Sequence, residues 1–227
     1  MAKKKITRKE LLKKDDEFIS LSNRIYMYLS DHAKQVQYSI ISLVLILAII
    51  GGIGLYLKYL NKKALAAYSI AYKNMVTDFS TEKESDTVKK SIEEMDNIIK
   101  QYGYTKIATL AIPQLAYLNF GQGKYDEAIS LYNKYLDKEK SDSIYRSMAY
   151  FGLAAAYEAK SDYTSAAKYL KNILDDQNNF LREEAMFSLG RIYSHAGQLE
   201  PSRKVFQDFV NQFPESPLLP LAKSYLK

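Results

Sequence analysis

Cysteine and tryptophan are absent from this chain of 227 residues, and histidine occurs only twice. Without cysteine the chain has no disulfide bond, thiolate metal ligand, cysteine nucleophile or lipid anchor attached to a thiol. The two imidazoles belong to His32 and His195. His195 stands just before Gly197, near the expected end of a helix, where the helix dipole favours a cation. A capping or solvent-facing role therefore suits His195 better than catalysis.

Motifs for catalysis and cofactor binding are missing as well. The sequence contains no Walker loop, no G-x-S-x-G or H-E-x-x-H motif and no dinucleotide-binding fingerprint. Its acidic pairs are adjacent in sequence, which is typical of solvated helix surfaces and not of carboxylates that face each other across a cleft. We predict that the protein is not an enzyme and that it holds no cofactor and no metal ion.

The excess of basic charge is concentrated in the N-terminal tail. Residues 1–37 carry nine Lys and Arg against five Asp and Glu, whereas residues 58–227 carry 23 against 21. Nucleic-acid binding requires a concentrated basic surface that neutralises phosphates. The nearly neutral C-terminal part therefore gives no support to a nucleic-acid partner.

Residues 38–57 form a long apolar segment, with the sequence YSIISLVLILAIIGGIGLYL and no charged side chain. Twenty residues of α-helix rise about 30 Å, which matches the hydrocarbon core of a bilayer. Tyr38 and Tyr56 stand at the ends, as in the aromatic belts of membrane proteins, and the flanking charges are Lys34 and Lys58. This segment is predicted to be a transmembrane helix.

The span is predicted to remain as an uncleaved anchor. Residues 64–66 have the A-x-A sequence of a signal-peptide cleavage site, but both the tail and the apolar run are too long for a signal peptide. Four lysines follow within twenty residues of the span, and two basic residues precede it over the same distance. Because the charges of a long C-terminal domain have little influence on insertion, we expect the N-terminus in the cytoplasm.

The tail in front of the span contains a second helical pattern. Residues 7–10 form a capping box, and large apolar residues then recur at helical spacing. These residues are Phe18, Leu21, Ile25, Tyr28 and Leu29. The pattern fits an amphipathic helix in the membrane interface, and it fits equally a solvated basic tail that only sets the orientation of the span.

Three segments after residue 104 share one pattern of leucine, small and large apolar residues. The leucines are Leu115, Leu153 and Leu189, which gives periods of 38 and 36 residues. The other members are Ala116, Ala128 and Tyr132 in the first segment, Ala154, Ala166 and Leu170 in the second, and Gly190, Ser202 and Phe206 in the third. Periods of this length are typical of arrays of helical hairpins.

Each segment is predicted to form two helices joined by a short polar turn, so the fold class is all-α, with an α-solenoid after the span. One hairpin cannot bury its apolar face alone, and stacking of neighbouring hairpins makes the core continuous. Residues 105–227 are expected to hold three repeats and a C-terminal capping helix. Residues 58–104 are expected to form a degenerate, membrane-proximal hairpin with helices over residues 62–79 and 85–102.

Pro113 conflicts with the helix expected to begin near Thr105. Proline inside a helix removes one backbone hydrogen bond. That helix is therefore predicted either to begin later or to kink.

The recurring leucine, small and tyrosine positions resemble the tetratricopeptide repeat family over residues 105–214. Asn119 stands where the family pattern has tyrosine, Ser202 replaces the usual alanine, and no repeat has the frequent initial tryptophan. The arrangement of tail, single span and repeats resembles the membrane-anchored ancillary subunit of the bacterial Sec translocon. That resemblance implies a periplasmic scaffold or chaperone-like module in the inner membrane, with the translocon, envelope chaperones or secreted proteins as partners.

In tetratricopeptide arrays the first helix of each repeat lines a concave groove, so residues on its free face are candidates for partner contact. Pro113 occupies such a position. The predicted protein-binding residues are Tyr117, Phe120, Phe151, Glu158, Phe187, Arg191 and Ser194. Aromatic and arginine side chains are enriched among binding hot spots. The alternative is that the aromatic residues belong to the core and are covered by a neighbouring or capping helix.

Together with the resemblance, the sequence predicts a non-enzymatic, protein-binding scaffold in the inner membrane, with its repeats in the periplasm and an association with protein secretion. The alternative is a scaffold that faces the cytoplasm and assembles a membrane protein complex. The two predictions share the fold and the groove, and they differ in topology.

Overall fold

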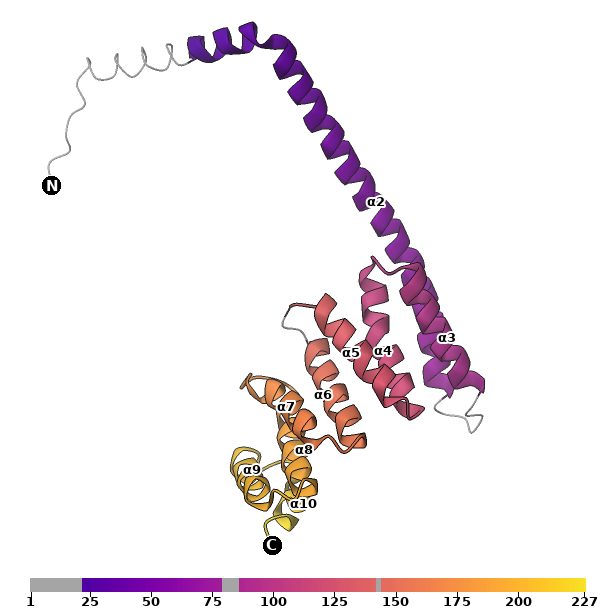
Figure 1. Ribbon diagram of the computed structural model, residues 1–227, viewed down its shortest axis with the longest axis vertical. Helices are drawn as coiled ribbons and strands as arrows, with labels where there is room; N and C mark the ends of the chain where they lie inside the picture. Colours follow the sequence, from indigo (N-terminus) through magenta and orange to yellow (C-terminus); the bar gives the residue numbers. More distant parts are fainter. Residues whose placement is uncertain (1–21, 79–85, 142–143) are drawn as a thin grey trace, which may run out of the picture. The chain divides into compact units, whose positions relative to one another are not determined.

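The computed structural model describes residues 22–78, 86–141 and 144–227 (Figure 1). Within these ranges every regular element is a helix, which confirms the predicted all-α class. The capping box of residues 7–10 and the side chains of Phe18 and Leu21 lie outside the described residues. The chain divides into two compact units, with the boundary between residues 56 and 57.

The first unit contains a helical segment over residues 22–31 and the first part of α2 (Ala33–Asp78). Among the described residues, α2 is the one helix that is long and apolar enough to cross a bilayer. Its apolar stretch is not buried inside the protein, since Leu47, Ile49 and Ile50 are 59, 61 and 60% exposed. An apolar surface of this extent requires an apolar environment or a partner.

The second unit is a row of helical hairpins (Figure 1). The pairs are α4 (Lys106–Gly121) with α5 (Tyr125–Lys138), α6 (Ile144–Ala159) with α7 (Tyr163–Leu174), and α8 (Arg182–His195) with α9 (Leu199–Gln212). Each of α5 and α7 also packs against the first helix of the next hairpin. The helices fall where the periods of 38 and 36 residues predict them.

The end of α2 and α3 (Asp86–Gln101) complete the N-terminal side of this row. Ala71 and Met75 of α2 are buried in one core with Met95 of α3 and Ala111 of α4. The sequence predicts a helix over residues 85–102, and α3 begins and ends one residue inside that range. The core of the first repeat depends on side chains from α2.

Two polar contacts reinforce this packing. The side-chain amide of Asn74 donates to Oε2 of Glu94 on α3 at 3.2 Å. The backbone N–H of Ile107, in the first turn of α4, donates to Oδ1 of Asn61 on α2 at 3.4 Å. The second contact joins residues 46 positions apart, so it ties α2 to the first repeat through tertiary structure.

The turns inside the three hairpins share one geometry. Gly123, Ser161 and Gly197 have φ angles of 73, 60 and 71°. In each turn this residue donates its N–H to the carbonyl three positions back, and the next residue donates to the carbonyl five positions back, which is a Schellman cap. Glycine adopts a positive φ without the steric cost of a Cβ atom. Ser161 is therefore the strained member of the three.

Two arginines connect successive repeats. The Arg146 guanidinium donates to the carbonyls of Leu136 and Glu139 at the end of α5. Arg182 donates in the same way to the carbonyl of Leu174 at the end of α7. The last carbonyls of a helix lack intrahelical partners, and a cation there also suits the helix dipole. Each arginine therefore caps the hairpin that precedes it.

Helix α4 begins directly after Thr105, whose Oγ1 accepts the N–H of Ala108 at 3.1 Å. The predicted alternative of a later start is therefore wrong. Pro113 lies inside the helix, where its nitrogen has no hydrogen to donate to the carbonyl of Thr109. The helix continues past this missing bond.

A short C-terminal helix, α10 (Leu219–Ser224), packs against α9 and matches the predicted capping helix. Ala222 is fully buried and lies 37 residues after Ala185, which is also fully buried. Tyr225 stacks on Phe206 with ring centroids 4.4 Å apart. In position and packing, α10 corresponds to the first helix of a fourth unit.

Candidate protein-binding groove

The predicted groove residues occupy three recurring positions on α4, α6 and α8. The first position holds Pro113, Phe151 and Phe187, the second holds Tyr117, Ala155 and Arg191, and the third holds Phe120, Glu158 and Ser194. The structure places eight of these nine residues in three environments, and the ninth, Ser194, lies outside them. The three residues of α4 line an open pocket together with Phe151 and Ala155. Glu158 and Arg191 form an ion pair. Phe187 lies in the core.

An apolar pocket of about 480 Å³ lies between α2, α4, α5 and α6. It brings together the predicted residues Pro113, Tyr117, Phe120 and Phe151. Among the residues that the structure describes, no charged side chain lines it. Pockets of this size that are lined mainly by apolar and aromatic groups are typical binding sites.

Large side chains at the pocket remain open to solvent. Tyr117 is 50% exposed, Tyr145 is 45% exposed and Met148 is 52% exposed. Phe151 is half-buried and also packs against the core of the second and third repeats. The pocket therefore combines exposed side chains that can contact a partner with an aromatic residue held in place by the core.

Eight lining residues were not among the predicted set, and four of them come from α2 and from the start of α6. Tyr72 and Met75 come from α2, where the repeat pattern is too degenerate to align. Tyr145 and Met148 lie on α6, six and three positions before Phe151. Because helix positions three or four apart share a face, extending the face of Phe151 by two turns would have found the second pair.

Tyr132 and Gly152 form the floor of the pocket. A Cβ atom at Gly152 would lie 2.3 Å from Cζ of Tyr132, so only glycine leaves room for this ring. Burial raises the pKa of the Tyr132 hydroxyl to about 12. The tyrosine therefore stays neutral, which preserves the uncharged lining of the pocket.

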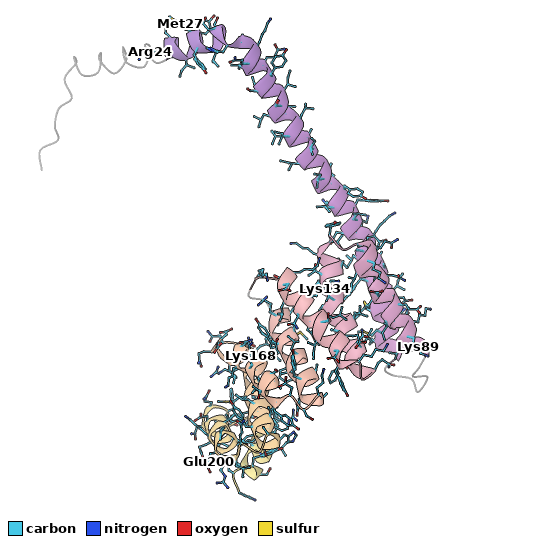
Figure 2. The ribbon with its side chains drawn as sticks, viewed as in Figure 1. Arg24, Met27, Lys89, Lys134, Lys168 and Glu200 are labelled. Atoms are coloured by element: carbon cyan, nitrogen blue, oxygen red, sulfur yellow. The ribbon has the colours of Figure 1, made fainter. Side chains whose placement is uncertain are left out.

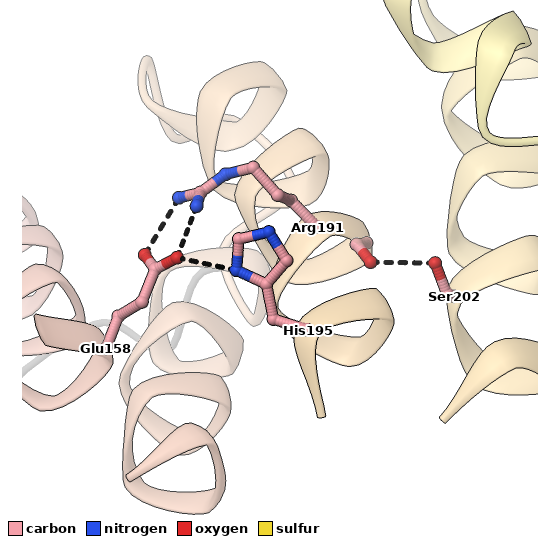
Figure 3. Close-up of polar contacts among 5 residues, drawn as sticks. Glu158, Arg191, His195 and Ser202 are labelled. Atoms are coloured by element: carbon pink, nitrogen blue, oxygen red, sulfur yellow. Dashed lines mark hydrogen bonds and ion pairs between the residues drawn. The ribbon is translucent and has the colours of Figure 1, made fainter. Parts of the chain in front are cut away.

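Glu158 and Arg191 form an ion pair between α6 and α8 (Figure 3). Nη1 and Nη2 of Arg191 both donate to the Glu158 carboxylate, and the distance from Nη2 to Oε2 is 2.8 Å. Nδ1 of His195 lies 3.4 Å from Oε1 of Glu158. His195 is in the last turn of α8, as expected, and its ring packs edge-on against Tyr163.

The ion pair makes the two gaps between first helices chemically different. Glu158 and Arg191 occupy the third and second positions of successive repeats. In the preceding pair of repeats the same positions hold Phe120 and Ala155, which line the apolar pocket. The groove is therefore apolar between α4 and α6 and is bridged by charge between α6 and α8.

Phe187 does not contribute to a binding surface. It is 8% exposed and packs against Phe206, Phe209 and Tyr225. The prediction of a surface role is corrected for this residue, because α9 and the segment after α10 cover its ring. The alternative of a core aromatic covered by a capping helix applies here.

Ser194 lies half-buried in the last turn of α8, where its carbonyl accepts the N–H of Gly197. Close by in sequence, the Oγ of Ser202 donates to the carbonyl of Gly190 at 2.8 Å (Figure 3). This bond explains the serine at a position that is alanine in the first two repeats. Ser194 is therefore placed on α8 next to the turn, outside the apolar pocket.

No group of three or more His, Asp or Glu side chains is placed to hold a metal ion in the part of the chain that the structure describes. The pocket contains aromatic rings, two thioethers and tyrosine hydroxyls. These groups recognise apolar surface and donate hydrogen bonds. The arrangement is suited to contact with another molecule.

Comparison with known proteins identifies the fold. A family model described as a tetratricopeptide repeat-like domain matches residues 32–223. TPR-like repeats of nearly identical sequence from Podosopora anserina superpose with a TM-score of 0.58 at 16% identity, over 73% of this chain and 84% of that chain. A tetratricopeptide repeat protein from Parabacteroides merdae gives 0.59 at 13% identity, over 73% and 59%.

MamA from Desulfovibrio magneticus is also similar, with a TM-score of 0.53 at 17% identity, over 71% of this chain and 84% of that chain. At these identities the likeness concerns the fold. None of the curated protein sequences matches the chain significantly. Since the family model covers most of the sequence and the structure shows the repeats themselves, the chain belongs to the tetratricopeptide repeat-like domain family.

Proposed function

We propose that this protein is a non-enzymatic adaptor, anchored in a membrane, whose repeat domain binds apolar segments of partner proteins. The observation that carries the proposal is the apolar pocket between α2, α4 and α6. It presents Tyr117, Tyr145 and Met148 to solvent at 50, 45 and 52% exposure. Tetratricopeptide-like repeats are in general scaffolds for protein binding.

The pocket chemistry favours an apolar segment over a charged one. Removing a charged group from water without a paired countercharge is costly, and none of the described charged side chains lines this pocket. Tyrosine offers a large contact area with few rotatable bonds, and methionine adapts to irregular surfaces. A partner would therefore insert aliphatic or aromatic side chains, and several different sequences would satisfy the site.

We further propose that residues 38–57 span the bacterial inner membrane, with the N-terminus in the cytoplasm and the repeats in the periplasm. The exposed apolar stretch of α2 supports the span. The resemblance in arrangement to the ancillary subunit of the Sec translocon supports the periplasmic side. In that place the pocket would serve as an adaptor or chaperone-like site for secreted proteins, envelope chaperones or the translocon.

A second candidate is a scaffold that faces the cytoplasm and assembles a membrane protein complex. The observation in its favour is the distribution of positive charge near the span. Residues 58–77 contain four lysines, whereas residues 18–37 contain two basic residues. Positive residues close to a span favour the cytoplasmic side.

Protease accessibility separates the two candidates. We expect the repeat domain to resist an added protease in intact cells. In spheroplasts, whose outer membrane has been opened, we expect the protease to digest it. Protection that lasts until the inner membrane is lysed would reject the periplasmic adaptor and leave the cytoplasmic scaffold.

Binding is tested with a matched pair of double variants of the full chain in detergent. Tyr117→Ala with Met148→Ala removes two exposed pocket side chains, and Tyr104→Ala with Leu199→Ala removes two exposed side chains elsewhere. The probe is a permanently unfolded model protein. We expect the pocket variant to bind roughly tenfold more weakly, with the control unchanged. Equal affinity of the two variants would exclude the pocket as the binding site.

A further inference from the structure

Five consecutive large apolar residues stand before the candidate span, with eight residues in between. Residues 25–29 (IYMYL) lie in the helical segment over residues 22–31. Their exposures are 53, 73, 62, 62 and 43% in sequence order. Figure 2 shows Met27 and Arg24 on this segment, which no other described part of the first unit covers. Such a surface is unfavourable in water.

The segment has two faces. At 100° per residue, Ile25, Tyr28 and Leu29 point to one side of the helix. Asn23 and Ser30 point to the other, together with Arg24, Asp31 and two of the large apolar residues, Tyr26 and Met27. Three of the five apolar residues thus form a stripe, which is the pattern of a helix that lies at a boundary between apolar and polar surroundings.

The helix is interrupted at His32, where a turn separates residues 22–31 from α2. The backbone around this turn is held locally: the His32 N–H donates to the carbonyl of Tyr28 at 3.1 Å, and the Val36 N–H donates to the carbonyl of His32 at 3.0 Å. The ring of His32 stacks on Tyr28 with centroids 4.4 Å apart.

The interruption allows the segment to leave the axis of α2. If α2 continued straight, Ile25 would lie 13 residues before Tyr38, or about 20 Å outside the hydrocarbon core. The apolar stripe would then stand in water. A segment that turns at His32 can instead lie along the membrane surface, where its stripe reaches the boundary between headgroups and acyl chains.

We propose that residues 22–32 form an interfacial helix that lies along the bilayer on the N-terminal side of the span. Ile25, Tyr28 and Leu29 are immersed at the acyl boundary, and Asn23 and Ser30 face water. The occupant of the stripe is lipid, because the stripe continues into the candidate span after only eight residues. The inference rests on the proposed span of residues 38–57.

The charges of this region predict which lipids are needed. Arg24 and Lys34 are balanced in part by Asp31, so the segment has little net charge. Anionic lipid attracts a basic segment in proportion to the positive charge that the segment places near the surface. The helix should therefore bind through apolar burial and should lie at the same depth in zwitterionic bilayers.

The absence of cysteine makes depth measurement direct, since each substitution introduces a single thiol. The full chain carrying Asn23→Cys, Ile25→Cys, Leu29→Cys or Ser30→Cys is labelled with a nitroxide and reconstituted into phosphatidylcholine vesicles. Electron paramagnetic resonance then compares collisions with oxygen and with a water-soluble nickel complex. We expect labels at 25 and 29 to lie about 5–10 Å below the headgroups and labels at 23 and 30 to be aqueous.

Two control sites separate this inference from the proposed span. A label at Ile46→Cys should lie in the hydrocarbon core, and one at Tyr104→Cys should be aqueous. Aqueous signals at 23, 25, 29 and 30 with a buried label at 46 would overturn the interfacial helix alone. An aqueous label at 46 would overturn the span as well. Burial of 25 and 29 in native membranes but not in pure lipid would assign the stripe to a protein partner and reject lipid.

Discussion

Glu158 and Arg191 lie one helical turn out of register on neighbouring repeats, and their two-point ion pair bridges α6 and α8. The Glu158 side chain is 18% exposed and that of Arg191 is 32% exposed, so the pair is only partly screened by water. Between α4 and α6, the equivalent position of the groove is open and apolar. The ion pair thereby limits the apolar part of the groove to the first half of the repeat domain.

We expect Glu158→Gln and Arg191→Gln each to destabilise the domain, and the double variant to lose less than the sum of the two. The expected coupling energy is about 1 kcal/mol, because the pair is bidentate but partly exposed. Urea unfolding of the four chains, followed by circular dichroism, measures it. Strictly additive losses would show that the pair does not hold the two helices together.

Ser161→Gly should stabilise the protein by about 0.5–1 kcal/mol. The native φ of 60° strains serine, and relief of that strain exceeds the entropy that glycine adds to the unfolded chain. The reciprocal change Gly197→Ser should destabilise by a similar amount, since φ at Gly197 is 71°. The midpoint of urea unfolding reports both changes. A lower midpoint for Ser161→Gly would contradict the argument from backbone strain.

Gly152→Ala should destabilise the domain by about 1–3 kcal/mol, because its Cβ would overlap the ring of Tyr132. The second repeat suggests a rescue. Leu170 stands there at the position of Tyr132, and Ser188 stands at the position of Gly152 in the following repeat. Tyr132→Leu should therefore recover part of the loss caused by Gly152→Ala. If the double variant is no more stable than additivity predicts, the overlap is not the cause.

Alkaline stability tests the burial of Tyr132. Its pKa is about 12 in the folded protein and 10.0 when unperturbed, so between pH 10 and 12 the unfolded chain loses this proton first. Stability that is present below pH 10 is therefore lost as the pH rises through this window, by roughly 2–3 kcal/mol in total. Tyr132→Phe should flatten the decline relative to the unchanged protein. Parallel pH profiles for the two chains would mean that the hydroxyl titrates normally.

The helices and turns of the repeats could be predicted because local signals define them. Leu115, Leu153 and Leu189 mark the periods, and short polar sequences mark the turns between paired helices. The α4 start was uncertain because Pro113 disfavours a helix interior locally. Packing of α4 against α3 and α5 outweighs the loss of one hydrogen bond.

The candidate site could be predicted only in part, because its chemistry depends on contacts between repeats. Phe151 and Phe187 occupy the same position in successive repeats, yet only Phe187 is covered by Tyr225 and Phe206. Sequence spacing does not distinguish them. Glu158 and Arg191 were both expected in the groove, but their pairing with each other follows only when the second and third positions of adjacent repeats are compared.

A fragment of this protein without the candidate span must keep the core that α2, α3 and α4 share. A fragment that begins at Thr105 would contain the three recognisable repeats, but it would strip Ala71, Met75 and Met95 from the face of α4. It would also remove one wall of the apolar pocket. Cleavage after residues 64–66 would sever the helix beside Ala64, which is fully buried, and would discard Asn61. A fragment that begins at residue 57, the start of the second compact unit, keeps this core together with Asn61.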